Sequence, residues 1–242
     1  MPESFRLLAC AAAALCFALP ALAQEAAIRK AIAERLPEFP KIDEVREAPL
    51  KGLYEIRVGT DIFYSDAGGN YLIEGQLIET RTKANLTEQR IAKLTAIDFA
   101  SLPLQDAIVW KQGNGTRKLV VFADPNCGYC KKFEKDLTNV KDVTVYTFLY
   151  PILGGDSPDK SRDIWCAKDN TKVWRDWMVA GTPPPKNIGP CDTAALARTA
   201  ALGRKYKVTG TPALVFEDGK RVPGAMAPAD VEKLLLAAQG KS

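Results

Sequence analysis

An apolar run that reads as a buried β-strand leads into two cysteines and then into a helix-like stretch. The run is Leu119–Phe122, and the cysteines are Cys127 and Cys130, with Gly128 and Tyr129 between them. A cysteine at a helix start faces unpaired backbone N–H groups and the positive end of the helix dipole. Both favour the thiolate, which is the form that attacks disulfides. The sequence therefore predicts a strand–turn–helix unit that carries sulfur redox chemistry.

The geometry of a helix N-terminus gives the two cysteines different roles. The first cysteine points outward and the second points back toward the protein. Cys127 is therefore predicted to be the exposed nucleophile and Cys130 the shielded resolving thiol. Lys131 and Lys132 follow directly and add a positive field, although solvent screens exposed charges. A site that favours thiolate stabilises the dithiol, so we expect a comparatively oxidising pair.

The chain of 242 residues contains no histidine, which excludes Ser-His-Asp and Cys-His catalysis and any histidine-ligated metal site. Its net charge is +4 with acids and bases mixed along the chain, which does not indicate nucleic acid binding. The alternative for the CxxC is half of a zinc site completed by Cys166 and Cys191. Those two are 25 residues apart and form no second CxxC. We expect no metal and no cofactor.

Residues 1–23 have the composition of a secretory leader. Residues 7–19 are nearly all apolar, and the sequence Ala-Leu-Ala at 21–23 is typical of a cleavage site. A membrane anchor needs about 20 apolar residues, and a proline interrupts this shorter run. A lipoprotein site at Cys10 is preceded by too little apolar chain. We predict cleavage before Gln24 and export as a soluble protein.

Four cysteines remain after removal of the leader, which carries Cys10 and Cys16. An even number of cysteines in an exported chain suggests disulfides, and four cysteines allow three connectivities. The natural partition is one short loop within the CxxC and one longer loop between Cys166 and Cys191. A structural disulfide is the simplest interpretation of this second pair, and a second redox relay is the alternative.

The pattern of apolar residues divides the mature chain into three parts. Residues 24–84 contain a helical pattern and then short strands with turns, which predicts a small helix-and-antiparallel-sheet domain. Asn85 caps a predicted helix of about 13 to 16 residues. We interpret residues 85–103 as a linker helix, and the alternative is a helix within one continuous domain. Residues 104–242 alternate strand and helix around a helical insert, which fits an α/β sandwich.

The small domain has about 60 residues, which is few for a stable core. Dimerisation through an edge of its sheet would cover an exposed strand and enlarge that core. The sequence therefore favours a homodimer.

A second motif lies about 80 residues after the CxxC. In the segment Gly210–Ala213 a proline, Pro212, stands at the head of an apolar strand, where its missing N–H is tolerated. A cis Thr211–Pro212 bond is an alternative that about one X-Pro bond in twenty adopts. The motif is weak alone and becomes specific when it is paired with an upstream CxxC.

Taken together, these motifs resemble those of the DsbC/DsbG family of the thioredoxin superfamily. The resemblance covers nearly all of the mature chain and rests on Gly52–Glu55, Asn85–Thr87, Phe122–Cys130 and Val208–Pro212. It implies an α+β fold, in which a C-terminal thioredoxin-like fold with a helical insertion follows a small cystatin-like dimerisation domain and a linker helix. It also implies a V-shaped homodimer in the periplasm.

The resemblance implies a thiol–disulfide isomerase that uses no cofactor. Cys127 would be the attacking thiol and Cys130 the resolving thiol, with Pro212 as a cis-proline facing them. Thr211, Pro212 and Tyr129 would contact substrate. The implied partners are unfolded or misoxidised exported proteins, a membrane reductase of the DsbD type and a second copy of the chain.

Two departures from related sequences bear on the chemistry. Thioredoxin carries a buried carboxylate six residues before its first catalytic cysteine, where this chain has Val121. A proton acceptor for Cys130 must then be water or an inward-facing Glu134, and we interpret Glu134 as a solvated helix residue. Proteins of the DsbG type have proline in place of Gly128 and usually lack the second cysteine pair. Both features favour the isomerase.

Two other functions remain as alternatives. One is a DsbG-like reductase that protects single cysteines from sulfenic acid. The other is a holdase chaperone whose cysteines are incidental. We expect Trp165, Trp174 and Trp177 to belong to the core and not to a binding surface.

Overall fold

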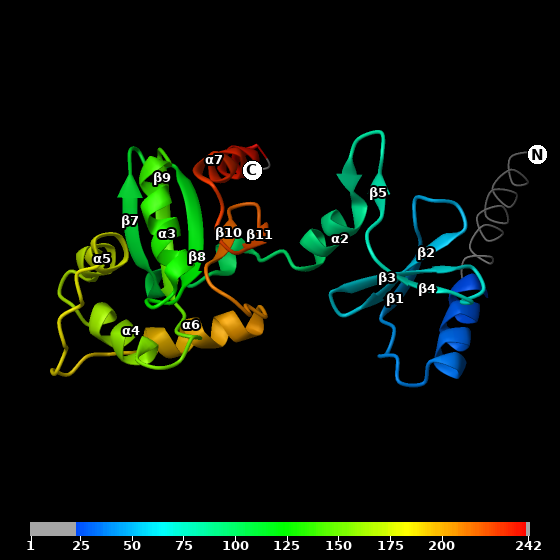
Figure 1. Ribbon diagram of the computed structural model, residues 1–242, viewed down its shortest axis with the longest axis horizontal. Helices are drawn as coiled ribbons and strands as arrows, with labels where there is room; N and C mark the ends of the chain where they lie inside the picture. Colours follow the sequence, from blue (N-terminus) through cyan, green and yellow to red (C-terminus); the bar gives the residue numbers. More distant parts are fainter. Residues whose placement is uncertain (1–22, 241–242) are drawn as a thin grey trace, which may run out of the picture. The chain divides into compact units, whose positions relative to one another are not determined.

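The computed structural model describes residues 23–240, which divide after Leu94 into two compact units (Figure 1). Nearly all of the predicted leader, with Cys10 and Cys16, lies outside the described residues. Within residues 23–240, none of the helices combines the length and the apolar character that a bilayer crossing requires.

The first unit consists of a helix and a twisted antiparallel sheet. The helix covers residues 23–35 and buries Ile28 and Ile32 against the sheet. The sheet has the order β1-β2-β3-β4. Its strands are β1 (Glu44–Glu47), β2 (Leu53–Val58), β3 (Asp61–Asp66) and β4 (Leu72–Glu74), followed by the pair β5 (Ile78–Glu79) and β6 (Ala84–Asn85) and by helix α2 (Leu86–Leu94). The predicted helix-and-antiparallel-sheet domain is therefore confirmed.

Helix α2 has nine residues, so the expected length of about 13 to 16 residues is wrong. The chain beyond it enters the second unit, where Ile97 is buried. The N–H of Ile97 donates to the carbonyl of Gly219 at 3.0 Å. Because Ile97 fills a core position in another unit, the backbone leaves the helix before reaching it.

Polar contacts fix α2 on the sheet of the first unit. The guanidinium of Arg90 lies between two carboxylates, with Nε 2.9 Å from Glu55 and Nη2 2.7 Å from Glu44. The hydroxyls of Thr87 and Tyr64 are 2.5 Å apart. The helical part of the predicted linker therefore packs as part of the first unit.

The second unit is built on a five-stranded sheet with the order β11-β10-β8-β9-β7. Strands β8 and β9 are parallel and the other pairs are antiparallel. The strands are β7 (Ile108–Gln112), β8 (Arg117–Ala123), β9 (Val143–Leu149), β10 (Ala213–Phe216) and β11 (Arg221–Pro223). This sheet with helices on both faces is the predicted thioredoxin-like fold.

Helices cover both faces of this sheet, and an insert of further helices follows β9 (Figure 1). Helices α3 and α7 share one core with the insert, and α6 packs on the other face. The helices are α3 (Gly128–Asp136), α4 (Ser157–Trp165), α5 (Asn170–Arg175), α6 (Ala194–Lys205) and α7 (Pro228–Gln239). Short helical turns are η1 (Phe99–Ser101), η2 (Leu104–Asp106), η3 (Leu137–Asn139) and the π-helical turn η4 (Asp176–Ala180).

Strand β8 is apolar throughout its second half because both of its faces are covered. Leu119 and Val121 belong to the core under α3, and Val120 and Phe122 belong to the core under α6. A central strand buried on both faces reads as a continuous apolar run instead of an alternating one.

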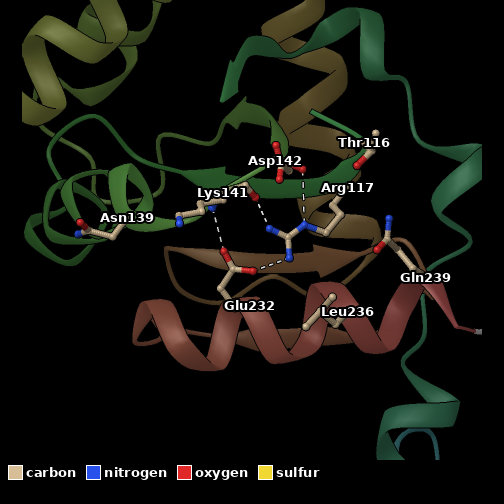
Figure 2. A pocket seen from close by; sticks show the side chains of 8 residues that line it. All are labelled: Thr116, Arg117, Asn139, Lys141, Asp142, Glu232, Leu236 and Gln239. Atoms are coloured by element: carbon tan, nitrogen blue, oxygen red, sulfur yellow. Dashed lines mark hydrogen bonds and ion pairs between the residues drawn. The ribbon is translucent and has the colours of Figure 1, made fainter. Parts of the chain in front are cut away.

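Arg117 at the start of β8 anchors the C-terminal helix (Figure 2). Its nearly buried guanidinium donates to the carboxylate of Glu232 on α7 and to the carbonyl of Lys141. Glu232 in turn accepts the Lys141 N–H at 2.8 Å. The shallow pocket that these residues line therefore holds a paired structural cluster.

Tyr150, which follows β9, joins the end of β8 to the chain that precedes β10. Its N–H donates to the carbonyl of Ala123 at 2.8 Å, and its hydroxyl donates to the carbonyl of Val208 at 3.1 Å. Gly203 on α6 lies against the ring, where an added Cβ would come within 2.4 Å of Cε2. The ring of Tyr150 therefore needs glycine at this position of the helix.

The variant Gly203→Ala tests this contact. A glycine-to-alanine change inside a helix normally stabilises by about 0.5–1 kcal/mol. Here we expect a loss of about 1–3 kcal/mol in the free energy of unfolding, because the new methyl group overlaps a buried ring. Chemical denaturation measures it. The variant Ala201→Gly, at an exposed position two residues earlier in the same helix, is the control for helix propensity alone and should cost about 1 kcal/mol. A stabilised Gly203→Ala protein would contradict the packing.

Candidate active site

Cys127 stands at the junction of β8 and α3, where it is the N-cap of the helix. Its Sγ accepts the N–H of Cys130 at 3.1 Å, and its own N–H donates to the carbonyl of Asp124 at 3.0 Å. A capping group satisfies one of the helix's unpaired donors. The N–H that would stabilise a sulfur anion is therefore already directed at Sγ.

The exposure of the two cysteines differs from the prediction. Cys127 is only 4% exposed and Cys130 only 1%, so the expected exposure of Cys127 is wrong. The segment before β10 lies over the sulfur, and the Cys127 thiol donates to the carbonyl of Thr211 at 3.2 Å. Within the motif it is Tyr129 that faces solvent, with 73% of its surface exposed.

Strand pairing brings the second motif to the first. Ala213 pairs with Phe122 in the antiparallel β10–β8 ladder. This register places Thr211 and Pro212 beside the end of β8, and the peptide bond between them is cis. The hydroxyl of Thr211 is buried and has no hydrogen-bond partner within the described residues. The structure thus brings four of the five predicted site residues of the two motifs together, and the fifth, Tyr129, faces solvent beside them.

Burial raises the pKa of the Cys130 thiol far above its ordinary value, and the adjacent Cys127 side chain raises it further. A thiol that lies away from water loses the solvation that would stabilise its anion. Cys130 is therefore a protonated thiol at neutral pH.

The other cysteine pair forms a disulfide. Cys166 at the end of α4 and Cys191 before α6 are joined, with a Cα–Cα distance of 5.8 Å, and Cys127 and Cys130 are free. This is the partition that the spacing favoured. It also contradicts the zinc alternative, which needs all four sulfurs as ligands.

Two family models match the chain. The model described as thioredoxin-like domain matches residues 104–239, and the model described as disulfide bond isomerase protein N-terminal domain matches residues 19–88. The probable thiol:disulfide interchange protein DsbC of Bordetella pertussis is 44% identical over 212 residues, which are 88% of this chain and 74% of the relative. The chain belongs to the DsbC family of thiol:disulfide interchange proteins.

Two further comparisons agree with this family. The thiol:disulfide interchange protein DsbC of Escherichia coli is 29% identical over 222 residues, with 89% of each chain covered. The crystal structure of a disulfide interchange protein from Neisseria gonorrhoeae is 38% identical, with a TM-score of 0.54 over 57% of this chain and 99% of that chain. As a DsbC family member, the chain is a thiol–disulfide oxidoreductase.

A buried carboxylate fixes the turn that leads into Cys127. Asp124 is fully buried and accepts hydrogen bonds from the Asn126 N–H at 2.8 Å, the Leu153 N–H at 3.0 Å and the Ser157 hydroxyl at 2.8 Å. A buried polar group is tolerated when it is hydrogen-bonded. Sequence reasoning gave Asp124 no role because two of its donors come from a distant loop and helix.

Trp177 in the π-helical turn η4 holds the same active-site turn from the other side. Its indole N–H donates to the carbonyl of Pro125 at 2.6 Å. The ammonium groups of Lys131 and Lys160 lie 3.6 and 4.6 Å from its ring centroid. Cation–π contacts of this kind are worth about 0.5–2 kcal/mol. The insert thus supports the loop in front of Cys127.

The prediction of core tryptophans holds fully for Trp174 and only in part for the others. Trp174 is completely buried, whereas Trp165 and Trp177 are partly buried at the edge of the core. Trp165 donates its indole N–H to the carbonyl of Asp192 at 3.0 Å.

Glu134 is buried, so its interpretation as a solvated helix residue is wrong. It is 1% exposed, and its Oε1 accepts the indole N–H of Trp174 at 2.9 Å. Burial raises the pKa of Glu134 to about 6, against the opposing effects of the Trp174 hydrogen bond and the charge of Arg175. The insert buries a face of α3 that the pattern of apolar residues in this helix would place in solvent.

The variant Glu134→Gln keeps the shape and the acceptor for Trp174 but cannot ionise. Because the pKa of Glu134 is about 6 in the folded protein and 4.5 ordinarily, the folded state binds more protons between those values. The wild type should therefore lose stability relative to the variant as pH rises through this window, by about 2 kcal/mol in total.

Chemical denaturation from about pH 4 to pH 8 measures this difference, which should level off above the folded pKa. Asp136→Asn removes the same charge from a partly buried position of the same helix, where Asp136 pairs with Lys132, and is the control. A pH-independent difference between wild type and Glu134→Gln would contradict the assigned burial.

Proposed function

We propose that this chain isomerises wrong disulfides in exported proteins and that Cys127 and Cys130 are its redox pair. The observation that carries the proposal is the position of Cys127. Its sulfur caps α3, accepts the Cys130 N–H and lies 3.2 Å from the carbonyl of Thr211 beside the cis Pro212. The Cys130 N–H can stabilise this sulfur after it has lost the proton that the thiol donates to the Thr211 carbonyl.

In the proposed reaction the Cys127 thiolate attacks one sulfur of a client disulfide and displaces the other as a client thiolate. The product is a mixed disulfide between Cys127 and the client. A second client thiolate then attacks the client sulfur of this bond, which forms a new client disulfide and returns Cys127 as thiolate. No net electrons are transferred on this route.

Cys130 provides a second route. Its thiolate attacks Cys127 Sγ, which forms the Cys127–Cys130 disulfide and releases the client reduced by two electrons. A reductant must then reduce the enzyme again. We propose a membrane reductase of the DsbD type for this role, acting in the periplasm.

The proposed client contact lies around the cis-proline segment. Because Cys127 has little exposed surface, a client must present an extended and accessible disulfide to it. Tyr129 and Leu153 are exposed apolar side chains near the active-site turn, at 73% and 58%. The N–H of Leu153 bonds Asp124, which keeps that loop beside the turn. Thr211 and Pro212 offer a backbone edge to an extended client segment. We therefore propose that the clients are unfolded or misoxidised chains.

Export to the periplasm is proposed from two features of the chain. Residues 1–23 have the pattern of a signal peptide with cleavage before Gln24. The Cys166–Cys191 disulfide suits an oxidising compartment.

A homodimer through the first unit is the proposed assembly. Strand β4 is an edge of its sheet, and Ile73 on this strand and Tyr71 just before it are 48% and 72% exposed. Ile78 on β5 is also exposed, at 51%. An exposed edge with apolar side chains is a template for strand pairing with another chain. We propose that a second copy of this chain occupies it.

The redox roles are tested by refolding of a scrambled multi-disulfide protein. Cys127→Ser should reduce the yield of native disulfides to that of the uncatalysed reaction, since no thiolate is left to start exchange. Cys130→Ser should keep part of the isomerase activity and accumulate mixed disulfides, because only client thiols can then release Cys127. Gel analysis after alkylation quantifies both.

The same variants separate the two alternatives. A holdase predicts that Cys127→Ser suppresses client aggregation fully and refolds clients as well as the wild type. A reductase of sulfenylated cysteines predicts fast reduction of a single-cysteine sulfenic acid and no gain in scrambled refolding. Either result would overturn the isomerase proposal.

The assembly is tested by charge at the edge strand. Replacing Tyr71 and Ile73 by lysine should turn the dimer into a monomer in light scattering after size exclusion, because two buried ammonium groups oppose the pairing. Leu50→Lys, at an exposed position of the β1–β2 turn, is the matched control and should remain dimeric. A dimeric double variant would place the interface elsewhere.

A further inference from the structure

Glu134 is a buried carboxylate that the exchange chemistry described above leaves unused. Its Oε1 accepts one hydrogen bond from Trp174, and its Oε2 has no partner within the described part of the chain. Burial of a charged group with an unsatisfied oxygen is costly, so such a group calls for a functional explanation.

The carboxylate lies in a small polar cluster inside the core. The side-chain donors of Trp110 on β7 and Thr147 on β9 act on the carboxylate and lower its pKa, and these donors make no other hydrogen bond in residues 23–240. Thr147 pairs with Val121 in the parallel β8–β9 ladder. Glu134 therefore reaches from α3 to the sheet next to Val121, the strand position that carries no acid in this chain.

Cys130 lies one helical turn before Glu134 on the same buried side of α3. Residues four apart on a helix are about 5–6 Å apart between Cβ atoms. Both are 1% exposed and share the interior beneath the active-site turn. A long side chain on a helix is directed toward the preceding turn, so Glu134 extends from its position on α3 toward Cys130.

The chemistry of Cys130 requires a base at this place. Its thiol must lose a proton before its sulfur can attack, and burial raises the pKa of this thiol strongly. Bulk water has little access to a side chain that is 1% exposed. An internal group has to accept the proton.

We propose that Glu134 is the general base for Cys130 in the resolving step. The proton of Cys130 passes to Glu134, the Cys130 thiolate attacks Cys127 Sγ, and the Cys127–Cys130 disulfide forms as the client thiolate leaves. The client takes its proton from solvent. Reduction of the pair reverses the path and returns the proton from Glu134 to Cys130. This inference rests on the proposed redox roles of the two cysteines.

The surroundings of Glu134 suit this role. Arg175 on α5 is the charged group that acts on it from the packed elements, while Trp110 and Thr147 do not titrate. Its guanidinium lies 4.2 Å from the ring centroid of Trp110. With a pKa of about 6, Glu134 is ionised at neutral pH, and this pKa lies near the operating pH, where a general base is most effective.

A single-turnover experiment on the full chain tests the proposal. The Cys127 mixed disulfide with thionitrobenzoate is formed, and release of the coloured thiolate by Cys130 is followed by stopped flow. Glu134→Gln should slow this release about 100-fold at pH 7, the usual range for loss of a general base, and should abolish the inflection of the rate near pH 6.

Asp136→Asn removes a partly buried carboxylate that pairs with Lys132 on the same helix, and it should release thionitrobenzoate at the wild-type rate. Release by Glu134→Gln at the wild-type rate, with an unchanged pH profile, would overturn the proposal. Attack of Cys127 on the reagent is measured separately in Cys130→Ser. Failure of that attack would overturn the proposed redox roles instead, so the two failures are distinguishable.

Infrared difference spectra of the wild type give an answer that does not depend on a folded variant. Between reduced and oxidised protein near pH 6, the carboxyl C=O band should change as the proton moves between Cys130 and Glu134. Absence of any redox-dependent carboxyl band would overturn the proposal.

Discussion

The antiparallel pairing of β10 with β8 is the constraint on which the active site depends. It brings Thr211 and Pro212 against Cys127, although the two motifs are separated by most of the second unit's sequence. Strand β8 is buried on both faces, so its register cannot slip by one residue without moving its side chains to the wrong core. The same ladder that stabilises the fold therefore sets the position of the carbonyl that faces the reactive sulfur.

The helical insert is the second constraint, because it turns an ordinary helix surface into an interior. Trp174 and Trp177 lie at its centre and make their indole hydrogen bonds to Glu134 and to the carbonyl of Pro125. One contact fixes a carboxylate inside the core, and the other fixes the loop before Cys127. Because burial disfavours a charged carboxylate, covering by the insert is what raises the pKa of Glu134.

The fold and the residues of the two motifs could be predicted because each is indicated by a pattern of neighbouring residues in the sequence. The apolar run of β8, the cysteine spacing and the proline before β10 each reflect the short-range chemistry of a strand, a helix start or a strand head. The burial of Cys127, the position of Glu134 and the end of α2 were predicted wrongly. Each depends on a segment far away in the sequence: the cis-proline loop, the insert and the turn at Gly219. Helical periodicity could not indicate the inward side of α3, because the insert buries a glutamate there.

In the proposed reaction, isomerisation and reduction compete for one mixed disulfide, and the protonation of Cys130 decides between them. A client thiol that is already ionised can attack as soon as the chain rearranges. Cys130 first has to lose a proton within the core, where burial holds its pKa high. The longer that step takes, the more often the client forms a new disulfide before Cys130 can release it in the reduced state. If Glu134 accepts this proton, its own environment, Trp174, Trp110 and Arg175, sets the balance between the two outcomes. The insert would then serve as the part of the fold that tunes isomerase against reductase activity.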